Sequence, residues 1–320
     1  MTIRILVLLA LALIVAAAVA QGTAYPAKPV RIVVPSSPGG GTDILARVLA
    51  QKLSESQGQQ FVVENRPGAG QVIGIEAVAR SAPDGYTLLM AASAIVINEV
   101  LYAKPPYDTL RDFVPVTLGA SLPNILVVHP ALPVKSVREL IALAKARPGQ
   151  LNYSSAGSGT SPHLSMELFR LMAGITLTHV PYKGTGPATV DLVAGQVQLS
   201  MPNVLTALPQ IKGGKLRGLG VTSAKRATGL PDIPAIAETL PGYEAIQWYG
   251  LLAPAGTPRE IVNKVQAETA RILVLPEVKA RLAADGADAV GNRPEEFAAY
   301  IRTEIAKWGK VVKAGGIKLE

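Results

Sequence analysis

The stretch VRIVVPSSPGGGTDILARVLAQKL, residues 30–53, passes from an apolar run through three consecutive glycines into an amphipathic segment. We expect a strand over residues 30–34 and a helix over residues 44–56. In that helix Ile44, Leu45, Val48, Leu49 and Leu53 share one face. A strand followed by a glycine turn and a helix is typical of one unit of an α/β domain.

The glycine run comprises Gly39, Gly40 and Gly41. Glycines at a helix start let the backbone approach a ligand closely, and the first-turn N–H groups have no acceptor within the helix. With the positive end of the helix dipole, these donors form an anion site. The simpler alternative is a tight turn in which the next residue, Thr42 or Asp43, caps the helix.

The residues around the glycines indicate which anion fits. A phosphate-binding loop needs lysine and a hydroxyl residue after its last glycine, but Thr42 and Asp43 stand there. A small carboxylate needs less. It could be held by one or two backbone N–H groups and a hydroxyl from Ser36, Ser37 or Thr42.

A second stretch has the same form. Residues 152–169, NYSSAGSGTSPHLSMELF, run from a strand into a helix that begins near Pro162. The turn offers hydroxyls and backbone donors from Ser155, Gly157, Ser158, Gly159 and Thr160. Two such loops in two units could clamp a dianion between them. His163, in the first helical turn, could contact the ligand or serve as a neutral capping or packing residue.

Composition excludes several function classes. The 320 residues carry a formal net charge of +8, but the basic residues are scattered and aromatic residues make up only 5%. We therefore expect no nucleic-acid partner. The chain has no cysteine and three histidines without zinc-ligand spacing, so we predict no metal, no cofactor and no thiol catalysis.

The N-terminal residues have the character of a secretory signal. Arg4 precedes an apolar run, and Ala18-Val19-Ala20 is a small-x-small cleavage site. We expect residues 1–20 to be removed by cleavage after Ala20 or nearby, which places the protein in the periplasm.

Short apolar runs alternate with helical patterns from residue 30 onward, which predicts two sets of strand–helix units with mostly parallel sheets. From about residue 260 the pattern is helical. This is typical of a chain that returns to cover its first domain.

The chain does not match two common sequence motifs, one for dinucleotide binding and one for serine hydrolases. The segment GAGQVIG, residues 68–74, has one residue too many for a dinucleotide-binding turn. The G-x-S-x-G elbow of serine hydrolases is absent. An exported hydrolase using Ser158 or Ser161 with His163 remains the rival from another class.

Several segments resemble the substrate-binding proteins of tripartite tricarboxylate transporters, the Bug-type (TctC-like) extracytoplasmic solute receptors. They follow the family order over nearly the whole chain after residue 24. The matching segments include YPAKPVRIVVPSSPGGGTDILAR, VVENRPGAG, APDGYTLLMA, LNYSSAGSGTSPHLSMELF, HVPYKGTGPATVDLVAGQVQ and WYGLLAPAGTP.

The resemblance implies a two-domain periplasmic-binding-protein type II fold. Each domain would be a mostly parallel sheet flanked by helices, with the ligand cleft between them. Domain 1 would comprise residues 25–116 and 250–320, and domain 2 residues 117–249. The hinge would lie near residues 116–121 and 248–252. A ligand carboxylate would be held by the loops matching residues 36–43 and 155–160, and we add Ser93, Lys183 and Asn203 to the predicted site.

Two departures from the family pattern bear on the ligand. Ser36 and Ser37 stand where relatives carry an apolar residue, and Met201-Pro202-Asn203 stands where relatives carry Phe-Asp-Asn. Without that acidic residue the site lacks a partner for an ammonium group, which disfavours an amino acid as the ligand. A di- or tricarboxylate or an aromatic carboxylate is favoured instead. The implied function is a monomeric, non-enzymatic receptor that delivers its ligand to a membrane permease; a sensor subunit for a membrane kinase is the alternative.

Overall fold

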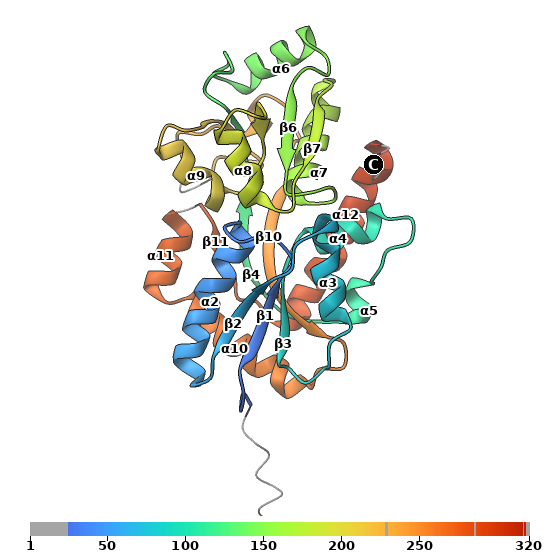
Figure 1. The fold of residues 1–320 in the computed structure, drawn as a ribbon, viewed down its shortest axis with the longest axis vertical. Helices are drawn as coiled ribbons and strands as arrows, with labels where there is room; N and C mark the ends of the chain where they lie inside the picture. The colour runs from blue at the N-terminus through green and yellow to red at the C-terminus, as the bar shows by residue number, and fades with distance from the viewer. Residues whose placement is uncertain (1–24, 228–229, 285, 316, 318–320) are drawn as a thin grey trace, which may run out of the picture.

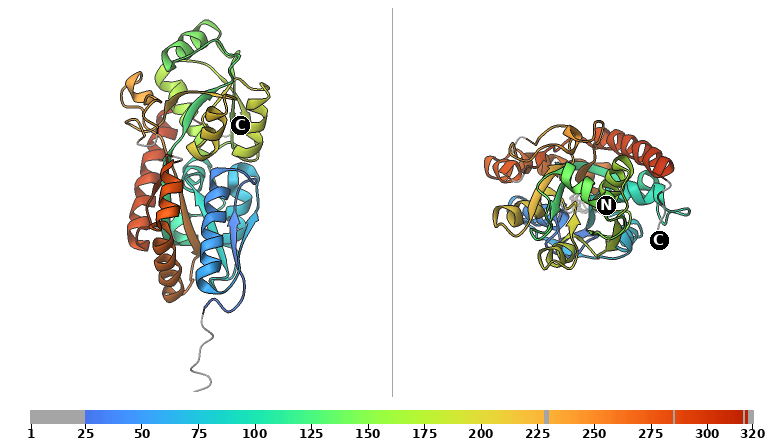
Figure 2. Two further views of the ribbon diagram at one scale, coloured as in Figure 1. Left: turned by 90° about the vertical axis from the view of Figure 1, so that its left-hand side faces the viewer. Right: turned by 90° about the horizontal axis from the view of Figure 1, so that it is seen from above.

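The computed structural model describes residues 25–227, 230–284, 286–315 and 317 of the chain. These residues form two lobes stacked along the long axis of the molecule (Figures 1 and 2). We call the lobe around the six-stranded sheet the first lobe and the lobe around the five-stranded sheet the second lobe. The predicted signal segment, residues 1–20, lies outside the described residues.

The first-lobe sheet has the strand order β11-β4-β10-β3-β1-β2. Strands β2 and β3 run parallel to β1, whereas β10 is antiparallel to β3 and β4, and β11 is antiparallel to β4. The strands are β1 (Val30–Val34), β2 (Phe61–Asn65), β3 (Thr87–Ala92), β4 (Phe113–Pro123), β10 (Ile246–Pro254) and β11 (Asp288–Ala289).

Helices cover both faces of this sheet, which explains the nearly continuous apolar run of β1. Ile32 and Val34 pack in one core cluster with Leu45 and Leu49 of α2, while Val33 packs in the other with Ile75 of α3. One face carries α2 (Gly41–Gln57), α10 (Arg259–Leu273) and α11 (Pro276–Ala284). The other carries α3 (Val72–Ala79), α4 (Ala94–Leu101) and α12 (Pro294–Gly315), and the short α5 (Thr109–Asp112) precedes β4.

The second-lobe sheet has the order β7-β6-β8-β5-β9. Strand β6 is parallel to β7 and β8, and β5 is antiparallel to β8 and β9. The strands are β5 (Ile125–Val128), β6 (Asn152–Ser155), β7 (Thr178–Pro181), β8 (Leu199–Ser200) and β9 (Arg217–Val221). Helices α6 (Val137–Ala146) and α7 (Ser161–Ala173) cover one face, α8 (Thr185–Val193) and α9 (Val204–Lys212) the other, and the 3-10 turn η2 (Ile236–Glu238) follows β9.

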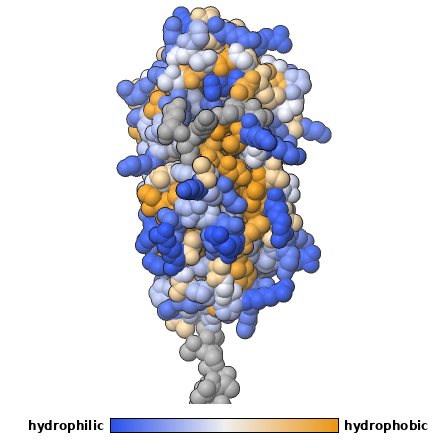
Figure 3. Space-filling model, turned by 90° about the vertical axis from the view of Figure 1, so that its right-hand side faces the viewer, coloured by the Kyte–Doolittle hydropathy of each residue, from blue (hydrophilic) through white to orange (hydrophobic). Residues whose placement is uncertain are grey.

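One side of the molecule has a band of apolar side chains along its middle (Figure 3). This side carries α4 and α12 (Figure 1), whose residues Val100, Val311 and Val312 pack on the core while staying only partly buried. Among the described residues, no helix has both the length and the apolar character needed to cross a membrane.

Most predicted elements are confirmed. The strand predicted at residues 30–34 is β1, and the predicted alternation of strands and helices continues through β2 and β3. The helix after the glycine run begins at Gly41, because the last glycine already belongs to its first turn. Both sheets are mixed, however, rather than mostly parallel. The chain leaves the first lobe through β4 and returns through β10, so these neighbouring strands must run in opposite directions.

Strands β4 and β10 form the connection between the lobes and pair from Phe113 and Pro254 to Pro123 and Ile246. Gly250 lies where this ribbon crosses α12. A Cβ atom there would lie 2.3 Å from Phe297 Cζ and 3.0 Å from the Thr117 carbonyl oxygen. Only glycine lets the ribbon pack this closely against the helix.

We expect Gly250→Ala to lower the free energy of unfolding by about 1–3 kcal/mol, because the added methyl overpacks the contact with Phe297. Gly309→Ala is the matched control. Its Cβ would meet only Val100 Cγ1, at 3.8 Å, and alanine favours a helix interior by about 0.5–1 kcal/mol. Urea unfolding of both variants measures the difference, and equal stabilities would contradict this packing.

Candidate ligand site at the seam between the lobes

Helices from both lobes point their N-termini at the seam between the lobes. The first backbone amide of α2 with a helical acceptor is that of Ile44, which donates to the Gly40 carbonyl at 2.9 Å, so the amides before it have no partner within the helix. Across the seam, a Cβ on Gly41 would lie 2.6 Å from Oδ1 of Asn203, the residue that caps α9. A Cβ on Gly40 would lie 3.8 Å from Thr185 at the start of α8.

The first loop, residues 35–40, is tied to the second lobe by hydrogen bonds. The Ser37 backbone N–H and its Oγ both donate to the Lys183 carbonyl oxygen, at 3.3 and 2.6 Å. Beyond it, a Cβ on Gly186 would lie 2.6 Å from the Pro38 carbonyl oxygen. The structure therefore describes the lobes in a closed arrangement at this loop.

Asp43 shapes the first loop instead of presenting a charge to the seam. Its carboxylate accepts hydrogen bonds from the Gly39 N–H at 3.0 Å, from Arg47 Nε at 2.9 Å and from Asn65 Nδ2 at 2.9 Å. Burial alone would raise the Asp43 pKa, but these hydrogen bonds outweigh it and hold the pKa below its ordinary value. The geometry gives the predicted site residue Asp43 a supporting role.

The second loop, residues 155–160, is held by its own hydroxyls. Ser155 Oγ lies 2.6 Å from His179 Nε2 and accepts a hydrogen bond from the Gly157 N–H at 3.1 Å. Thr160 Oγ1 donates to the Gly157 carbonyl at 2.6 Å. Gly157 and Gly159 have φ angles of 122° and 78°, a region of backbone conformation that residues with a Cβ rarely adopt. The first backbone N–H of α7 that donates to a carbonyl one turn earlier is that of Leu164, which donates to Thr160. The N–H groups before it have no acceptor within the helix.

A stack of aromatic rings supports this loop. The His163 and His179 rings stack at 4.4 Å, and Tyr153 stacks on His179 at 4.7 Å. His163 Nδ1 accepts a hydrogen bond from the Gly159 N–H at 3.2 Å. Burial lowers the pKa of His163 to about 4 and that of His179 to about 3. Both rings are therefore neutral at pH 7, and His163 is a loop-supporting residue here.

The floor of the seam holds a polar network on the ribbon between the lobes. Ser93 donates through Oγ to Gln247 Oε1, and its N–H donates to the Trp248 carbonyl at 3.2 Å. The Tyr249 hydroxyl lies against the start of α2, where a Cβ on Gly41 would be 2.5 Å from it, and burial raises the pKa of Tyr249. Sequence reasoning missed Gln247. A polar residue inside an apolar strand was the available signal.

A second contact across the seam involves Asn98, which sequence reasoning also missed. Asn98 Nδ2 donates to the Gly70 carbonyl at 2.8 Å, and a Cβ on Gly159 would lie 1.8 Å from Asn98 Oδ1. A Cβ on Gly70 would lie 2.0 Å from the Ser158 carbonyl oxygen. A cavity of about 390 Å³ opens beside this contact, with Tyr102 and Lys183 in its lining. The Lys183 side chain itself is exposed.

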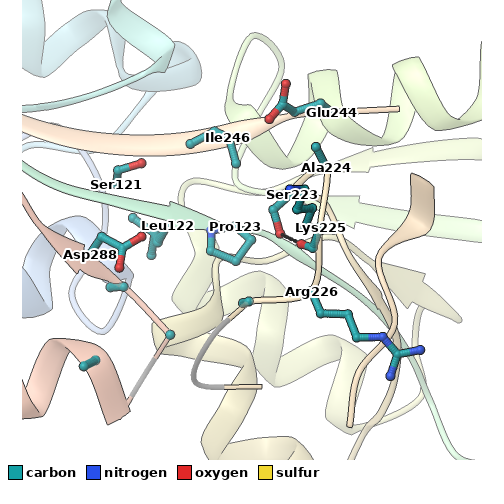
Figure 4. A pocket seen from close by; sticks show the side chains of 14 residues that line it. Ser121, Leu122, Pro123, Ser223, Ala224, Lys225, Arg226, Glu244, Ile246 and Asp288 are labelled. Atoms are coloured by element: carbon teal, nitrogen blue, oxygen red, sulfur yellow. Dashed lines mark hydrogen bonds between the residues drawn. The ribbon is translucent and has the colours of Figure 1, made fainter. Parts of the chain in front are cut away.

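The structure thus brings most predicted residues to one seam. The first loop, Thr42 and Asn203 meet near α8 and α9, and the second loop meets Gly70 and Asn98. A cavity of about 520 Å³ lies elsewhere, beside the ribbon, with Ser121, Glu244 and Asp288 in its wall (Figure 4). It contains no residue of either loop. In the described part of the chain, no three His, Asp or Glu residues gather as a metal site would require.

Residues 45–317 match the family described as tripartite tricarboxylate transporter family receptor. The chain belongs to this family. BugT of Bordetella pertussis is 41% identical to this receptor over 309 residues, which cover 96% of this chain and 94% of BugT.

Two solved structures show the same fold as this receptor. The Rhodopseudomonas palustris protein Rpa4515, solved with adipate, has 41% sequence identity and a TM-score of 0.89, and the match covers 92% of this chain and 99% of that one. The periplasmic binding protein BugD has 34% identity and a TM-score of 0.89, over 92% of this chain and 100% of its own. The periplasmic-binding-protein fold predicted from sequence is confirmed.

The histidine stack predicts how the stability of this receptor depends on pH. The folded-state pKa values near 4 and 3 lie below the value of about 6.5 for an unfolded imidazole. The unfolded chain therefore binds more protons below about pH 6.5, and the free energy of unfolding falls as the pH drops from there toward 4. Urea unfolding at a series of pH values measures this fall.

His163→Gln should flatten that pH dependence, since it removes one titrating ring. His129→Gln is the control, because His129 lies at the end of β5, away from the stack, where its Nδ1 accepts a hydrogen bond from the Ala131 N–H at 3.2 Å. An unchanged pH dependence in His163→Gln would contradict the view that the buried histidine stack causes the loss of stability at low pH.

Proposed function

We propose that this receptor binds a small organic carboxylate at the seam between its lobes. The observation that carries the proposal is the pair of glycine-rich and serine-rich loops, each ending at a helix N-terminus and each in contact with the opposite lobe. Adipate bound to Rpa4515, a relative with 41% identity, supports the same ligand class here.

The anion would be held by uncharged donors. The first turns of α2 and α7 supply backbone N–H groups, and the helix dipoles add positive potential. Ser36 is 5% exposed, and its Oγ has no hydrogen-bond partner in the described structure, so its hydroxyl could donate to a carboxylate. Hydrogen bonds to a charged group contribute about 1.5–3 kcal/mol each.

Binding without turnover fits the chemistry of the seam. The hydroxyl that meets an imidazole is Ser155 Oγ, 2.6 Å from His179 Nε2. Burial lowers the pKa of His179 to about 3, and a base that weak takes little part in proton abstraction near pH 7. Ser161 Oγ accepts a hydrogen bond from Asn124 Nδ2 at 2.9 Å. This arrangement favours a receptor over the rival Ser158 or Ser161 hydrolase.

Ligand binding would close two domains, residues 25–116 with 250–320 and residues 117–249, about the β4–β10 ribbon. Both boundaries fall inside these strands. The pairing register shifts between Tyr249 and Gly250 and again between Leu251 and Leu252. Such irregularities bend a strand and interrupt its ladder. They support a hinge near residues 116–121 and 248–252.

The cellular role would be capture in the periplasm and delivery to the membrane permease of a tripartite tricarboxylate transporter. The signal-like character of residues 1–20, the family of this receptor and the periplasmic BugD support this placement.

A thermal-shift panel of mono-, di- and tricarboxylates tests the ligand class. A true ligand at a hundredfold excess over its Kd should stabilise the receptor by about 2.7 kcal/mol. Native mass spectrometry of protein from the exported fraction would identify a retained acid. Stabilisation only by ligands without an acid group would overturn the proposal.

Gly186→Ala tests closure directly, because its added methyl would meet Pro38 of the opposite lobe. We expect binding of the best carboxylate from the panel to weaken by about 1–3 kcal/mol, while the melting temperature without ligand stays unchanged or rises. Isothermal titration calorimetry measures the affinity, with Gly309→Ala as the control. Undiminished affinity would show that these surfaces do not meet when the ligand binds.

A further inference from the structure

The segment Gly68–Gln71, which the function above does not use, has an unusual backbone. Its four residues have φ angles of 133°, 46°, 60° and 83° in chain order. Ala69 and Gln71 are the two non-glycine residues with positive φ in the described chain. Side chains disfavour this region because Cβ crowds the backbone, so both positions carry strain.

The strain at Gln71 is not offset by a helix-capping hydrogen bond. The segment forms the 3-10 turn η1 (Ala69–Gln71), and Gln71 is the N-cap residue of α3. Its side chain makes no capping hydrogen bond. Glycine would adopt the same conformation without strain, so the glutamine side chain calls for a different role.

Gln71 is a buried residue that directly follows a contact across the seam in the chain. Gln71 is 7% exposed, whereas Ala69 and Ile73 near it are exposed. The preceding residue, Gly70, is the one that meets Ser158 of the second loop and accepts the hydrogen bond from Asn98. Gln71 therefore lies directly next to the place where the second loop closes on the first lobe.

The amide of Gln71 has an unmet hydrogen bond. Its Oε1 is buried and has no partner in the described structure, and the same holds for Oδ1 of Asn98. Buried amide oxygens are nearly always paired, so each calls for a donor. A carboxylate cannot supply one, because it only accepts hydrogen bonds. A hydroxyl on the ligand can.

We propose that Gln71 is a specificity-determining residue that selects carboxylates bearing a hydroxyl group. The ligand hydroxyl donates to Gln71 Oε1, while its carboxylate is held by the backbone amides of the two loops. The inference rests on the proposed function and deepens it, since it narrows the ligand class from carboxylates to hydroxycarboxylates. The strain at Gln71 is then the cost of a side chain kept for recognition.

Two pairs of acids that differ by one hydroxyl test this inference: malate with succinate, and 2-hydroxyglutarate with glutarate. Calorimetry should show that the wild-type receptor prefers the hydroxylated member by roughly three- to ten-fold, the range of one neutral hydrogen bond. In Gln71→Gly the preference should fall to about one. Its melting temperature without ligand should rise, because glycine relieves the backbone strain.

Ala69→Gly is the matched control. It relieves the same kind of strain two residues away and removes only an exposed methyl. Its melting temperature should rise as well, but its preference for the hydroxylated acids should equal that of the wild type. This separates recognition by the Gln71 amide from a general effect of loosening the turn.

The outcomes separate the two proposals. The role of Gln71 would be overturned if the wild type binds these acids, or adipate, but does not prefer the hydroxylated member of each pair. It would also be overturned if the preference persists in Gln71→Gly. Either result would leave the proposed function intact. Failure of the wild type to bind any carboxylate in the panel would overturn both.

Discussion

The amides at a helix start cannot be buried without an acceptor, and this constraint governs the seam between the lobes. Helices α2 and α7 begin at glycine-containing loops that contact the opposite lobe, and α8 and α9 begin directly across from α2. Closing the lobes removes these donors from water, which costs free energy unless an anion or water accepts their hydrogen bonds. In the proposed function, the backbone itself therefore couples closure to anion binding.

The side chains named at the seam are either neutral or already paired, so they do not repel an anion. Asp43 is engaged by Gly39, Arg47 and Asn65, and burial keeps the His163 and His179 rings uncharged. An anion entering the seam meets no unpaired buried carboxylate among these residues. Under the two proposals, selection among carboxylates of equal charge would depend on individual neutral groups, such as the Gln71 amide and the Ser36 hydroxyl, because the charge interaction is similar for such ligands.

The ribbon between the lobes is anchored to the returning helix by one carboxylate. Glu304 Oε2 of α12 accepts hydrogen bonds from the indole N–H groups of Trp248 and Trp308, at 3.2 and 3.1 Å. Trp248 lies between Gln247 and Tyr249, which belong to the floor of the seam. The C-terminal helix is therefore tied to the floor of the seam, next to the register shifts of β10 that support the proposed hinge.

The sequence by itself determined the strand–helix units, the family and both glycine loops, because hydrophobic periodicity and glycine turns are local signals. Tertiary structure decided the mixed direction of the sheets and the partners of each loop. Asn98 and Gln71 carry no local signature, since each gains its role from a contact or a backbone angle that only folding creates. Gln247 stands out only as a polar residue in an apolar strand, and its partner Ser93 is set by the fold. Asp43 shows the converse. Beside the glycines it has the position of a ligand contact, yet its carboxylate pairs with Arg47 one helical turn along α2 and accepts a hydrogen bond from Asn65, which the fold brings beside it.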